Sequence, residues 1–538
     1  MNKLIYFLRL IETVRHLKLI QIFYQLKKRL RKVKQKGCSK IENKYIKNAG
    51  LEFIKPGLIK KTSYQNGYFN FLNIPQIFEN NNIDWNLQHN GKLWIYNLNY
   101  FDYLSQSKID TKEAINLIQN FIQNVSYKDI GFDPYPISLR GINWIKFLNK
   151  NSISKESINR HLYNQYKYLE KNLEYHLMGN HLIENAFSLL FGAYFFKIKH
   201  WYLKSKKIIS NQLSEQVFYD GAHFERSPMY HSIILERLLD CINLLQNNQI
   251  FEKQNLLLKL MEEKGSCMLG WLERISCSPD EIPHFKDSVD DIGPTKTELI
   301  AYSKSLGLKI EKRPLSDSGY RRFDNSCWSL IADVGNIGPD YIPGHAHADC
   351  LNFVYYHQKK PIIVDTGIST YENNQLRQLQ RSTISHNTVE IDGQNSSDVW
   401  SAFRVGRRAR TAILKDQRNM LIASHDGYKN LGIIHKRSWI ISKENIRICD
   451  ELIGKPKLGR AYIHFDHRTK PRRSKCFIIV DGIKIRISGA QKITFLNYNQ
   501  ALRFNKTLPA VKVMIEFYSN LQVEILHKSA HENSVYNG

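Results

Sequence analysis

The stretch EKRPLSDSGYRRFDNSCWSLIADVG, residues 311–335, separates two parts of the chain that differ in hydrophobic period. Before it, apolar residues recur at three- and four-residue steps, for example over 180–197 and 229–246, which is typical of amphipathic helices. After it the period is two, and short apolar segments such as 476–489 and 511–518 lie between turn signals such as Asp-Gly. The sequence therefore predicts a multidomain α+β protein with helices first and antiparallel sheets second.

The helical segments are joined by short loops that contain Asn, Asp or Gly, and successive helical hairpins of this kind suit an incomplete α/α toroid. The many short strands that follow imply stacked antiparallel sheets, that is, a β-sandwich. A chain of 538 residues can bury more than one core. We predict three parts: a basic helical N-terminal arm over 1–55, the toroid over 56–315 and the β-sandwich over 316–538.

The composition is that of a folded protein with a strong positive charge. Lys and Arg number 77 against 50 Asp and Glu, which gives a formal net charge of +27. Such a charge favours acidic partners: nucleic acid, anionic lipid or a polyanionic polysaccharide. The sequence contains no helix-turn-helix, RNA-recognition or finger motif, so we expect no nucleic acid. The eight cysteines form no CxxC pair, which argues against a disulfide scaffold or a zinc ribbon and favours a reducing compartment.

The N-terminal segment 1–36 has apolar residues at helical spacing, with Lys and Arg crowding its end. It lacks a small-residue cleavage site and fails as a signal peptide. Two interpretations stay open: the helix packs on its own domain with a solvated basic face, which is the simpler one, or it lies on an anionic membrane surface. No stretch approaches 18 uncharged apolar residues, so we expect no transmembrane helix. We expect a cytoplasmic protein or one peripheral to the inner membrane, rather than a periplasmic one.

Three clusters of residues could carry chemistry. The first is GNHLIEN, residues 179–185, at the start of an apolar helix. Asn180 could cap this helix, and His181 and Glu184 would then share a face one turn apart. The alternative is a capped structural helix with a satisfied core histidine.

The second cluster is DGAHFERSPMYH, residues 220–231, at a loop-to-helix junction. It brings Arg226, Tyr230 and His231 together with other titratable groups of both signs. A tyrosine beside a cation can donate or accept a proton, so the segment suits acid–base catalysis. A structural salt-bridge network is the alternative.

The third cluster begins with GHAHADC, residues 344–350, and continues through VDTG and SHNTVEIDG. His347, Asp365 and His386 could be brought together by neighbouring strands. Two imidazoles and a carboxylate are a reasonable ligand set for a zinc-type metal. His345 would then be free for another role.

A smaller group of residues has the composition of a carbohydrate-binding surface. Aromatic rings stack on sugar faces, and a guanidinium pairs with carboxylate or sulfate. Burial of the same aromatics in the core is an equally good interpretation. The residues are Tyr100, Arg140, Asn143 and Trp144.

Five motifs, GNHLIEN, DGAHFERSPMYH, GHAHAD, VDTG and SHNTVEIDG, resemble in the same order those of the heparinase II/III family of polysaccharide lyases, which includes heparin and alginate degraders. The resemblance runs from about residue 90 to about residue 440. It implies an incomplete α/α toroid followed by stacked antiparallel sheets. It also implies a carbon–oxygen lyase (EC 4.2.2.-) that cleaves a uronic-acid polysaccharide by β-elimination, without consuming water.

The resemblance also implies roles for individual residues. Asn180 matches the group that neutralises the substrate carboxylate, with His181 and Glu184 beside it. Tyr230 matches the acid, or the combined acid and base, and His345 matches the histidine base of the sheet domain. A nearby histidine and a basic surrounding would lower the pKa of Tyr230 enough for work as a base.

His347, Asp365 and His386 match the metal triad of the family, usually given to zinc and mainly structural. Substrate contacts are expected from residues around these motifs: Tyr100, Arg140, Asn143, Trp144, Arg226 and His231. The expected substrate is an acidic glycan of a bacterial surface, such as capsule, O-antigen or exopolysaccharide. The alternative is a non-catalytic acidic-glycan-binding protein on the same fold. The sequence does not distinguish endo from exo action, or name the sugar.

Overall fold

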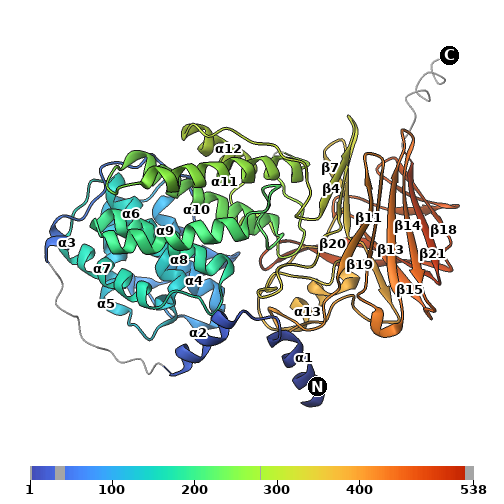
Figure 1. Cartoon of the computed structure of the whole chain (residues 1–538), viewed down its shortest axis with the longest axis horizontal. Coiled ribbons are helices and arrows are strands. Elements are labelled where there is room, and N and C mark those ends of the chain that lie inside the picture. The colour runs from blue at the N-terminus through green and yellow to red at the C-terminus, as the bar shows by residue number, and fades with distance from the viewer. Residues whose placement is uncertain (1–2, 31–42, 279, 527–538) are drawn as a thin grey trace.

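The computed structural model describes residues 3–30, 43–278 and 280–526, and it divides into a helical part and a part made of sheets (Figure 1). The last helix of the helical part ends at Ser305, and the first strand of the sheet part begins at Tyr320. This change of architecture lies where the hydrophobic period changes in the sequence.

The helices of the first part are arranged as successive hairpins around a buried helix. Helix α8 is mostly apolar, and every one of its residues except His181 is buried against its neighbours, as expected of a helix in the centre of a helical core. The elements are α3 (Asn43–Lys47), a small sheet of β1 (Tyr64–Gln65), β2 (Tyr68–Phe71) and β3 (Ile74–Ile77), and then α4 (Lys92–Tyr100), α5 (Thr111–Asn124), α6 (Pro134–Lys150), α7 (Glu156–Lys171), α8 (Gly179–Phe196), α9 (Lys199–Gln216), α10 (Pro228–Asn247), α11 (Gln254–Ile275) and α12 (Lys296–Ser305). Ile46 and Ile54 belong to the same core, so the last part of the predicted arm packs with the helices. The predicted domain bounds stay a prediction.

The second part consists of antiparallel sheets, as predicted. A four-stranded sheet has the order β4-β5-β6-β7, an eight-stranded sheet the order β11-β12-β13-β14-β21-β18-β17-β16, and a second four-stranded sheet the order β19-β20-β15-β8. The strands of the first sheet are β4 (Tyr320–Asp324), β5 (Trp328–Asp333), β6 (Phe353–His357) and β7 (Lys360–Ile363). The other elements are α13 (Gln375–Arg381), β8 (Val389–Ile391), β9 (Val399–Trp400), β10 (Arg404–Val405), β11 (Thr411–Gln417), β12 (Met420–His425), β13 (Ile434–Ile441), β14 (Asn445–Ile453), β15 (Gly459–His464), β16 (Arg472–Ser474), β17 (Phe477–Val480), β18 (Ile483–Ser488), β19 (Lys492–Arg503), β20 (Lys506–Phe517) and β21 (Asn520–Leu526).

The first sheet joins the two parts because both of its faces are buried. Ile331 and Val354 belong to the core of the helical part, whereas Leu330 and Phe353 belong to the core of the sandwich. Successive side chains of a strand point to opposite faces, so one sheet can serve two cores. The loop between β5 and β6 carries GHAHADC, residues 344–350, and therefore lies at the junction of the two parts.

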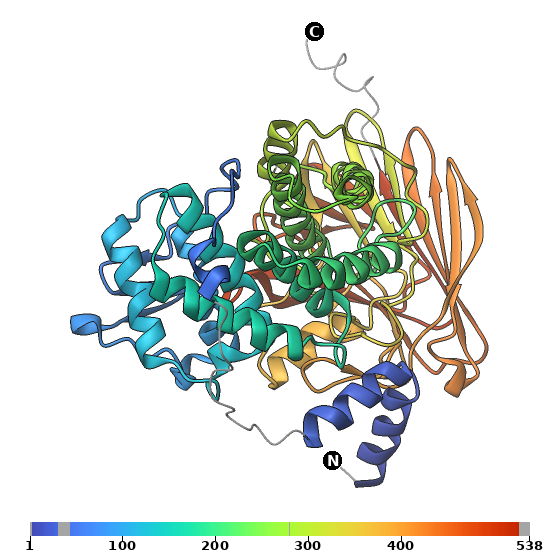
Figure 2. The same cartoon turned by 60° about the vertical axis from the view of Figure 1, so that its left-hand side comes forward.

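The N-terminal arm forms two helices, α1 (Lys3–Val14) and α2 (Leu19–Leu30), that lie outside both cores (Figure 2). The simpler prediction, an apolar face packed on its own domain, is wrong for α2: Gln21 is buried, whereas Leu19 and Leu30 are largely exposed. Among the described residues, no helix has both the length and the apolar character needed to cross a membrane.

Candidate active site

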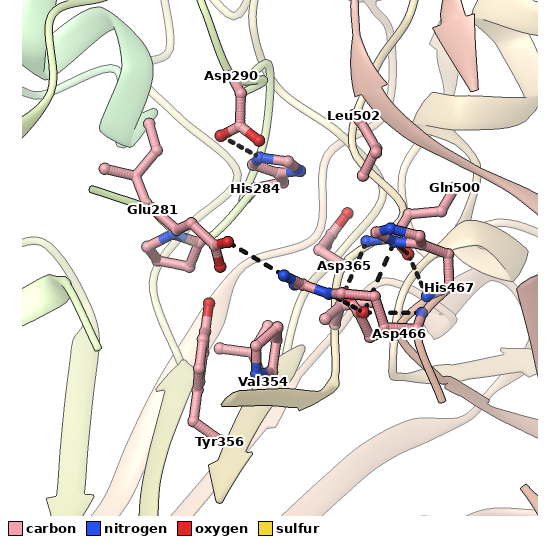
Figure 3. A pocket seen from close by; sticks show the side chains of 15 residues that line it. Glu281, His284, Asp290, Val354, Tyr356, Asp365, Asp466, His467, Gln500 and Leu502 are labelled. Carbon is pink, nitrogen blue, oxygen red and sulfur yellow. Dashed lines mark hydrogen bonds and ion pairs between the residues drawn. The ribbon is translucent and has the colours of Figure 1, made fainter. Parts of the chain in front are cut away.

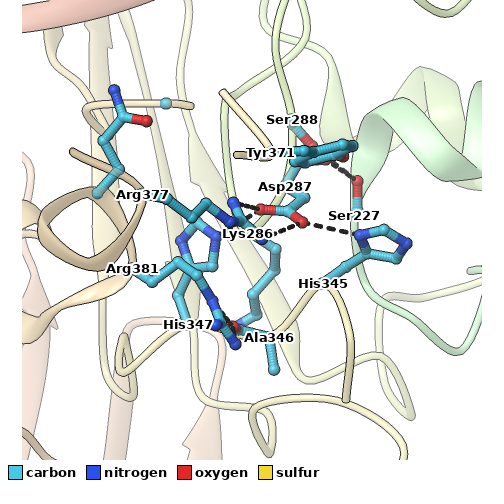
Figure 4. A network of polar contacts seen from close by, with 12 residues as sticks. Ser227, Lys286, Asp287, Ser288, His345, Ala346, His347, Tyr371, Arg377 and Arg381 are labelled. Atoms are coloured by element: carbon cyan, nitrogen blue, oxygen red, sulfur yellow. Dashed lines mark hydrogen bonds and ion pairs between the residues drawn. The ribbon is translucent and has the colours of Figure 1, made fainter. Parts of the chain in front are cut away.

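A buried carboxylate joins the two histidines of the 344–350 loop (Figure 4). His345 Nδ1 lies 2.8 Å from one oxygen of Asp287, and His347 Nε2 lies 2.8 Å from the other. Arg377, on α13, donates to both oxygens of the same carboxylate. Burial favours the neutral acid, but the charge of Arg377 and the hydrogen bonds outweigh it and keep the pKa of Asp287 well below its usual range. Asp287 is therefore an anion that fixes the orientation of His345.

Tyr230 reaches the same loop from the helical part. It lies in the first turn of α10, where the Ser227 side chain caps the helix by accepting a hydrogen bond from the Tyr230 backbone N–H. Its ring stacks on His345 with a centroid distance of 3.8 Å, and its hydroxyl lies 3.1 Å from that of Tyr371. Burial raises the pKa of Tyr230 above its ordinary value. The lowered pKa expected for this phenol is thus wrong in this structure.

Asn180 completes the group from the start of α8. Its side-chain amide donates to Glu225 Oε2 at 3.0 Å and lies 3.4 Å from His345 Nε2. The turn before it depends on Gly179, which has a φ of +54° and whose added Cβ would lie 2.8 Å from Ile342 and 3.0 Å from Glu225. The backbone of this turn can therefore approach the loop only because position 179 has no side chain.

An amide, a phenol and an imidazole thus converge from α8, α10 and the 344–350 loop. Because Asp287 holds Nδ1 of His345, the other ring nitrogen, Nε2, is the one that faces Asn180 and can accept a proton. The His345 side chain is 13% exposed, so the group is not sealed from solvent. An amide donor, a proton acceptor and a protonated phenol are what proton abstraction beside a carboxylate, followed by protonation of a leaving oxygen, requires.

Two family models match this chain. Residues 136–298 match the model described as heparinase II/III N-terminus, and residues 309–503 match the one described as heparinase II/III-like, C-terminal. The N-terminal model matches before the C-terminal one, and together they cover well over half of the chain. The chain belongs to the heparinase II/III family.

Curated and solved relatives of this heparinase II/III protein are distant in sequence. A heparin-sulfate lyase of Bacteroides stercoris is 23% identical over 408 residues, which make up 68% of this chain and 59% of that protein. The chain thus spans about three fifths of that relative. A crystal structure of heparinase III aligns with a TM-score of 0.61 at 17% identity, covering 82% of this chain and 77% of the other. A mutant heparan sulfate lyase of Pedobacter heparinus aligns with a TM-score of 0.57 at 17% identity, covering 95% and 88%. These likenesses confirm the predicted fold.

Two further residues predicted as catalytic follow Asn180 on α8 and differ in exposure. His181 is partly exposed, 3.3 Å from Glu174, and Glu174 outweighs burial to raise the pKa of the imidazole. Glu184 is fully buried, 4.0 Å from Arg237, and burial raises its pKa to about 8. A direct catalytic contact for Glu184 is therefore wrong in this structure, because substrate cannot reach the carboxyl.

Three residues predicted to contact substrate are instead buried structural residues of the helical part. Arg140 is fully buried and donates to Gln165 and to two backbone carbonyl oxygens. Asn143 donates to Asp102 and to a backbone carbonyl, and Trp144 is a core residue with no exposed surface. The predicted substrate contacts of Arg140, Asn143 and Trp144 are wrong, since each of these residues is at most 2% exposed.

The other predicted contact residues differ from one another. His231 is fully buried, 3.0 Å from the Met268 carbonyl oxygen, so its predicted contact with substrate is also wrong. The Arg226 guanidinium donates to the Asn336 carbonyl oxygen across the domain junction. Tyr100 is 7% exposed, and its contact with substrate stays a prediction.

The structure adds residues that the sequence analysis did not assign. Asp287 and Arg377 orient His345, Glu225 accepts from Asn180, and Tyr371 meets the Tyr230 hydroxyl. Glu225 lies within the quoted motif 220–231 and could have been found there. Nothing in the sequence marked Asp287 and Arg377 as site residues, because an Asp in a loop and an Arg in a helix usually face solvent.

The predicted metal ligands lie close together but are engaged in hydrogen bonds. His386 Nδ1 lies 2.8 Å from Asp365, and the rings of His347 and His386 have a centroid distance of 5.2 Å. Both imidazoles keep one buried nitrogen without a hydrogen-bond partner, His347 Nδ1 and His386 Nε2, so the donor chemistry fits a zinc ion. Within the described part of the chain, no three His, Cys, Asp or Glu side chains are arranged around one point as metal ligands. The zinc triad stays a prediction.

A pocket of about 200 Å³ lies between the segment after α11, strands β6 and β19, and the loops after β7 and β15 (Figure 3). Asp365 lines it, whereas none of the three converging side chains does. Its charged groups are paired with one another: Arg468 lies 3.2 Å from Glu281, and His284 lies 3.0 Å from Asp290. The pocket is therefore separate from the converging group.

Proposed function

We propose that this chain is a polysaccharide lyase that cleaves a uronate-containing anionic polysaccharide by β-elimination. The observation that carries the proposal is the convergence of Asn180, Tyr230 and His345. Membership of the heparinase II/III family and the names of its relatives, which are heparin-sulfate lyases, support it. A net charge of +27 favours an acidic substrate.

In this mechanism Asn180 binds the uronate carboxylate. Its amide donates a hydrogen bond and cannot compete as a base, so it stabilises the enolate-like charge that develops when the C5 proton leaves. Freeing this amide requires that it exchange its hydrogen bond with Glu225 for one with substrate. The neutraliser is therefore held in place by a protein carboxylate until the substrate carboxylate replaces it.

His345 takes the C5 proton on Nε2, and Tyr230 returns a proton to O4. Asp287 stabilises the imidazolium through Nδ1, as carboxylates behind catalytic histidines do. The C4–O4 bond breaks as the C4–C5 double bond forms, and no water is consumed. Because burial raises the Tyr230 pKa, the phenol keeps its proton at neutral pH and suits the acid role. This favours a mechanism in which His345 is the base and Tyr230 is the acid, over one in which Tyr230 is both.

We further propose that His347, Asp365 and His386 hold a structural zinc ion. The buried nitrogen atoms of the two imidazoles that lack partners support this assignment. When bound, the metal would cross-link three segments and take no part in proton transfer. The residues of this chain that move protons remain Tyr230 and His345.

The proposed substrate is a glycan of the cell's own surface, handled at a cytoplasmic or inner-membrane location. The experiment is incubation of purified protein with heparan sulfate, chondroitin sulfate, alginate and the surface polysaccharide of its source cell, with ultraviolet detection of unsaturated uronate. Absorbance that grows with any of these supports the lyase. Tight binding without product on all of them would favour the alternative, a non-catalytic acidic-glycan-binding protein.

A further inference from the structure

Helix α2 exposes its apolar face to solvent and directs polar groups toward the protein. Leu19, Phe23, Leu26 and Leu30 are 85%, 59%, 53% and 83% exposed. Their spacing of four, three and four residues places them in one stripe along the helix. Gln21, on a different face, is only 3% exposed. The helix is therefore inverted relative to a surface helix whose apolar stripe covers its own core.

Polar contacts hold α2 in this orientation. The Gln21 amide donates to the carbonyl oxygens of Leu177 and Tyr341 at 3.1 and 3.2 Å. Tyr24 stacks on Tyr175 with a centroid distance of 4.7 Å. These partners come from both domains, because Leu177 precedes α8 and Tyr341 belongs to the loop that leads to GHAHADC. The orientation of the stripe is thus set by specific contacts.

Helix α1 also leaves large apolar side chains uncovered. It is attached to the β9–β10 hairpin by an ion pair of 2.7 Å between Arg9 and Asp398 and by the Thr13 hydroxyl. Its exposed apolar residues are Tyr6, Phe7, Leu8, Ile11 and Val14. Figure 2 shows α1 and α2, in dark blue, side by side at the margin of the molecule. We call the exposed apolar residues of α1 and α2 the arm face.

The charge around the arm face selects its partner. Residues 1–36 contain eleven Lys and Arg against the single acidic residue Glu12. Lys27, Lys28 and Arg29 occupy the last turn of α2, next to the apolar stripe. A second copy of the chain would bring an equally basic arm against this one, which like-charge repulsion opposes. A polysaccharide or another polyanion alone would leave the apolar stripe in water.

We propose that the arm face docks on an anionic lipid bilayer. Apolar side chains between basic ones are what an interfacial helix presents to the boundary between headgroups and acyl chains. Each helix has 12 residues, too few to span a bilayer, so both lie in its surface. Phe403 lies in the turn of the β9–β10 hairpin, to which α1 is attached, and its ring centroid is 6.2 Å from that of His345. Docking therefore orients the catalytic group relative to the membrane, a consequence that rests on the proposed function.

The test is co-sedimentation of the full-length protein with vesicles of phosphatidylcholine alone or mixed with phosphatidylglycerol. The native protein is expected to bind the anionic vesicles and not the neutral ones. L19S/F23S/L26S and, separately, K27E/R29E are expected to weaken binding at least about tenfold. Absence of binding by the native protein to anionic vesicles, or undiminished binding by L19S/F23S/L26S, would overturn the proposal.

A matched control replaces exposed leucines elsewhere on the helical part, as in L203S/L256S, at positions 53% and 66% exposed. This variant is expected to bind like the native protein, and equal loss in it would contradict a role specific to the arm face. Light scattering gives the mass in solution, and a native dimer that L19S/F23S/L26S converts to a monomer would identify the face as a contact between copies. Lyase activity on a soluble glycan is measured separately. Failure of the membrane proposal can then be told apart from failure of the proposed lyase function.

Discussion

The ring of Tyr230 stacks on that of His345, with 3.8 Å between centroids, although one belongs to the helical domain and the other to the sheet domain. The first sheet, with one face in each core, holds the two domains in this relation. The proposed catalytic group can therefore form only while the domains are docked. We expect changes at the junction to affect catalysis before they affect the stability of either core.

Tyr230→Phe is expected to lower kcat by about a thousandfold, because the variant lacks the proton that O4 must receive. The ring and its stacking on His345 stay, and only the hydrogen bond to Tyr371 is lost, which costs about 1 kcal/mol. Product formation gives kcat, and thermal unfolding reports the fold. A variant with native kcat would remove Tyr230 from the acid role.

Asp287→Asn is expected to destabilise the fold by about 3 kcal/mol, because Arg377 is left as a buried charge without its partner. It should also lower kcat, since the orientation of His345 and the charge that stabilises its imidazolium are both lost. Asp450→Asn is the matched control. Asp450 is likewise buried and paired with Arg437, but within the sandwich. The control should lose stability while its remaining folded fraction keeps kcat, and an equal loss of kcat in both would contradict the positioning role.

Glu184 is expected to make stability fall as pH rises. Burial raises its folded pKa to about 8, so the folded protein holds a proton that the unfolded chain releases above about pH 4.5. The stability from this proton is present at low pH and is lost as pH rises through 8. Glu184→Gln carries no such proton, so it should gain at least about 1 kcal/mol relative to the native protein between pH 5 and pH 8, measured by urea unfolding.

Glu236, whose carboxylate lies 3.5 Å from Arg237, is the control because its pKa shifts in the opposite direction. Although burial favours its neutral form, the charges of Lys60 and Arg237 lower its pKa to about 2. Its stabilising contribution is present above its unfolded pKa and lost only as pH falls toward 2. Glu236→Gln should therefore cost the same at pH 5 and pH 8. If the unfolding free energies of Glu184→Gln and the native protein changed with pH in parallel, the burial of a protonated Glu184 would be contradicted.

Zinc is expected in the purified native protein and lost from His347→Ala, as measured by elemental analysis. Chelation should lower the thermal midpoint of the native protein but not that of the variant. His435→Ala is the control, because His435 is equally buried but hydrogen-bonds to Asp450 outside the triad. Undiminished zinc in His347→Ala would exclude this ligand set.

Much of the fold was predictable because periodicity reports burial directly. The change of period near residue 315 separates the helices from the sheets. The motifs of the family resemblance pointed to Asn180, Tyr230 and His345, whose catalytic roles stay predictions. The prediction was wrong for Arg140 and Trp144, which are buried. In the sequence, aromatic and Arg residues on a buried helix face cannot be told from those of a sugar-binding site.

The inverted orientation of α2 could not be predicted from sequence. An apolar stripe at helical spacing defines a face, but the stripe of a membrane-docking helix and that of a core-packing helix have the same pattern. Gln21 decides the orientation through two distant carbonyl groups, of Leu177 and Tyr341, which only the folded chain brings together. Asp287 and Arg377 escaped prediction for the same reason.

Cleavage by β-elimination is tested most directly by mass spectrometry of the products from a defined uronate oligosaccharide. The masses of the two fragments are expected to sum to that of the substrate, with one fragment carrying the C4–C5 double bond, and both should be absent with His345→Ala. Fragments that together exceed the substrate by one water would show hydrolysis and contradict the account.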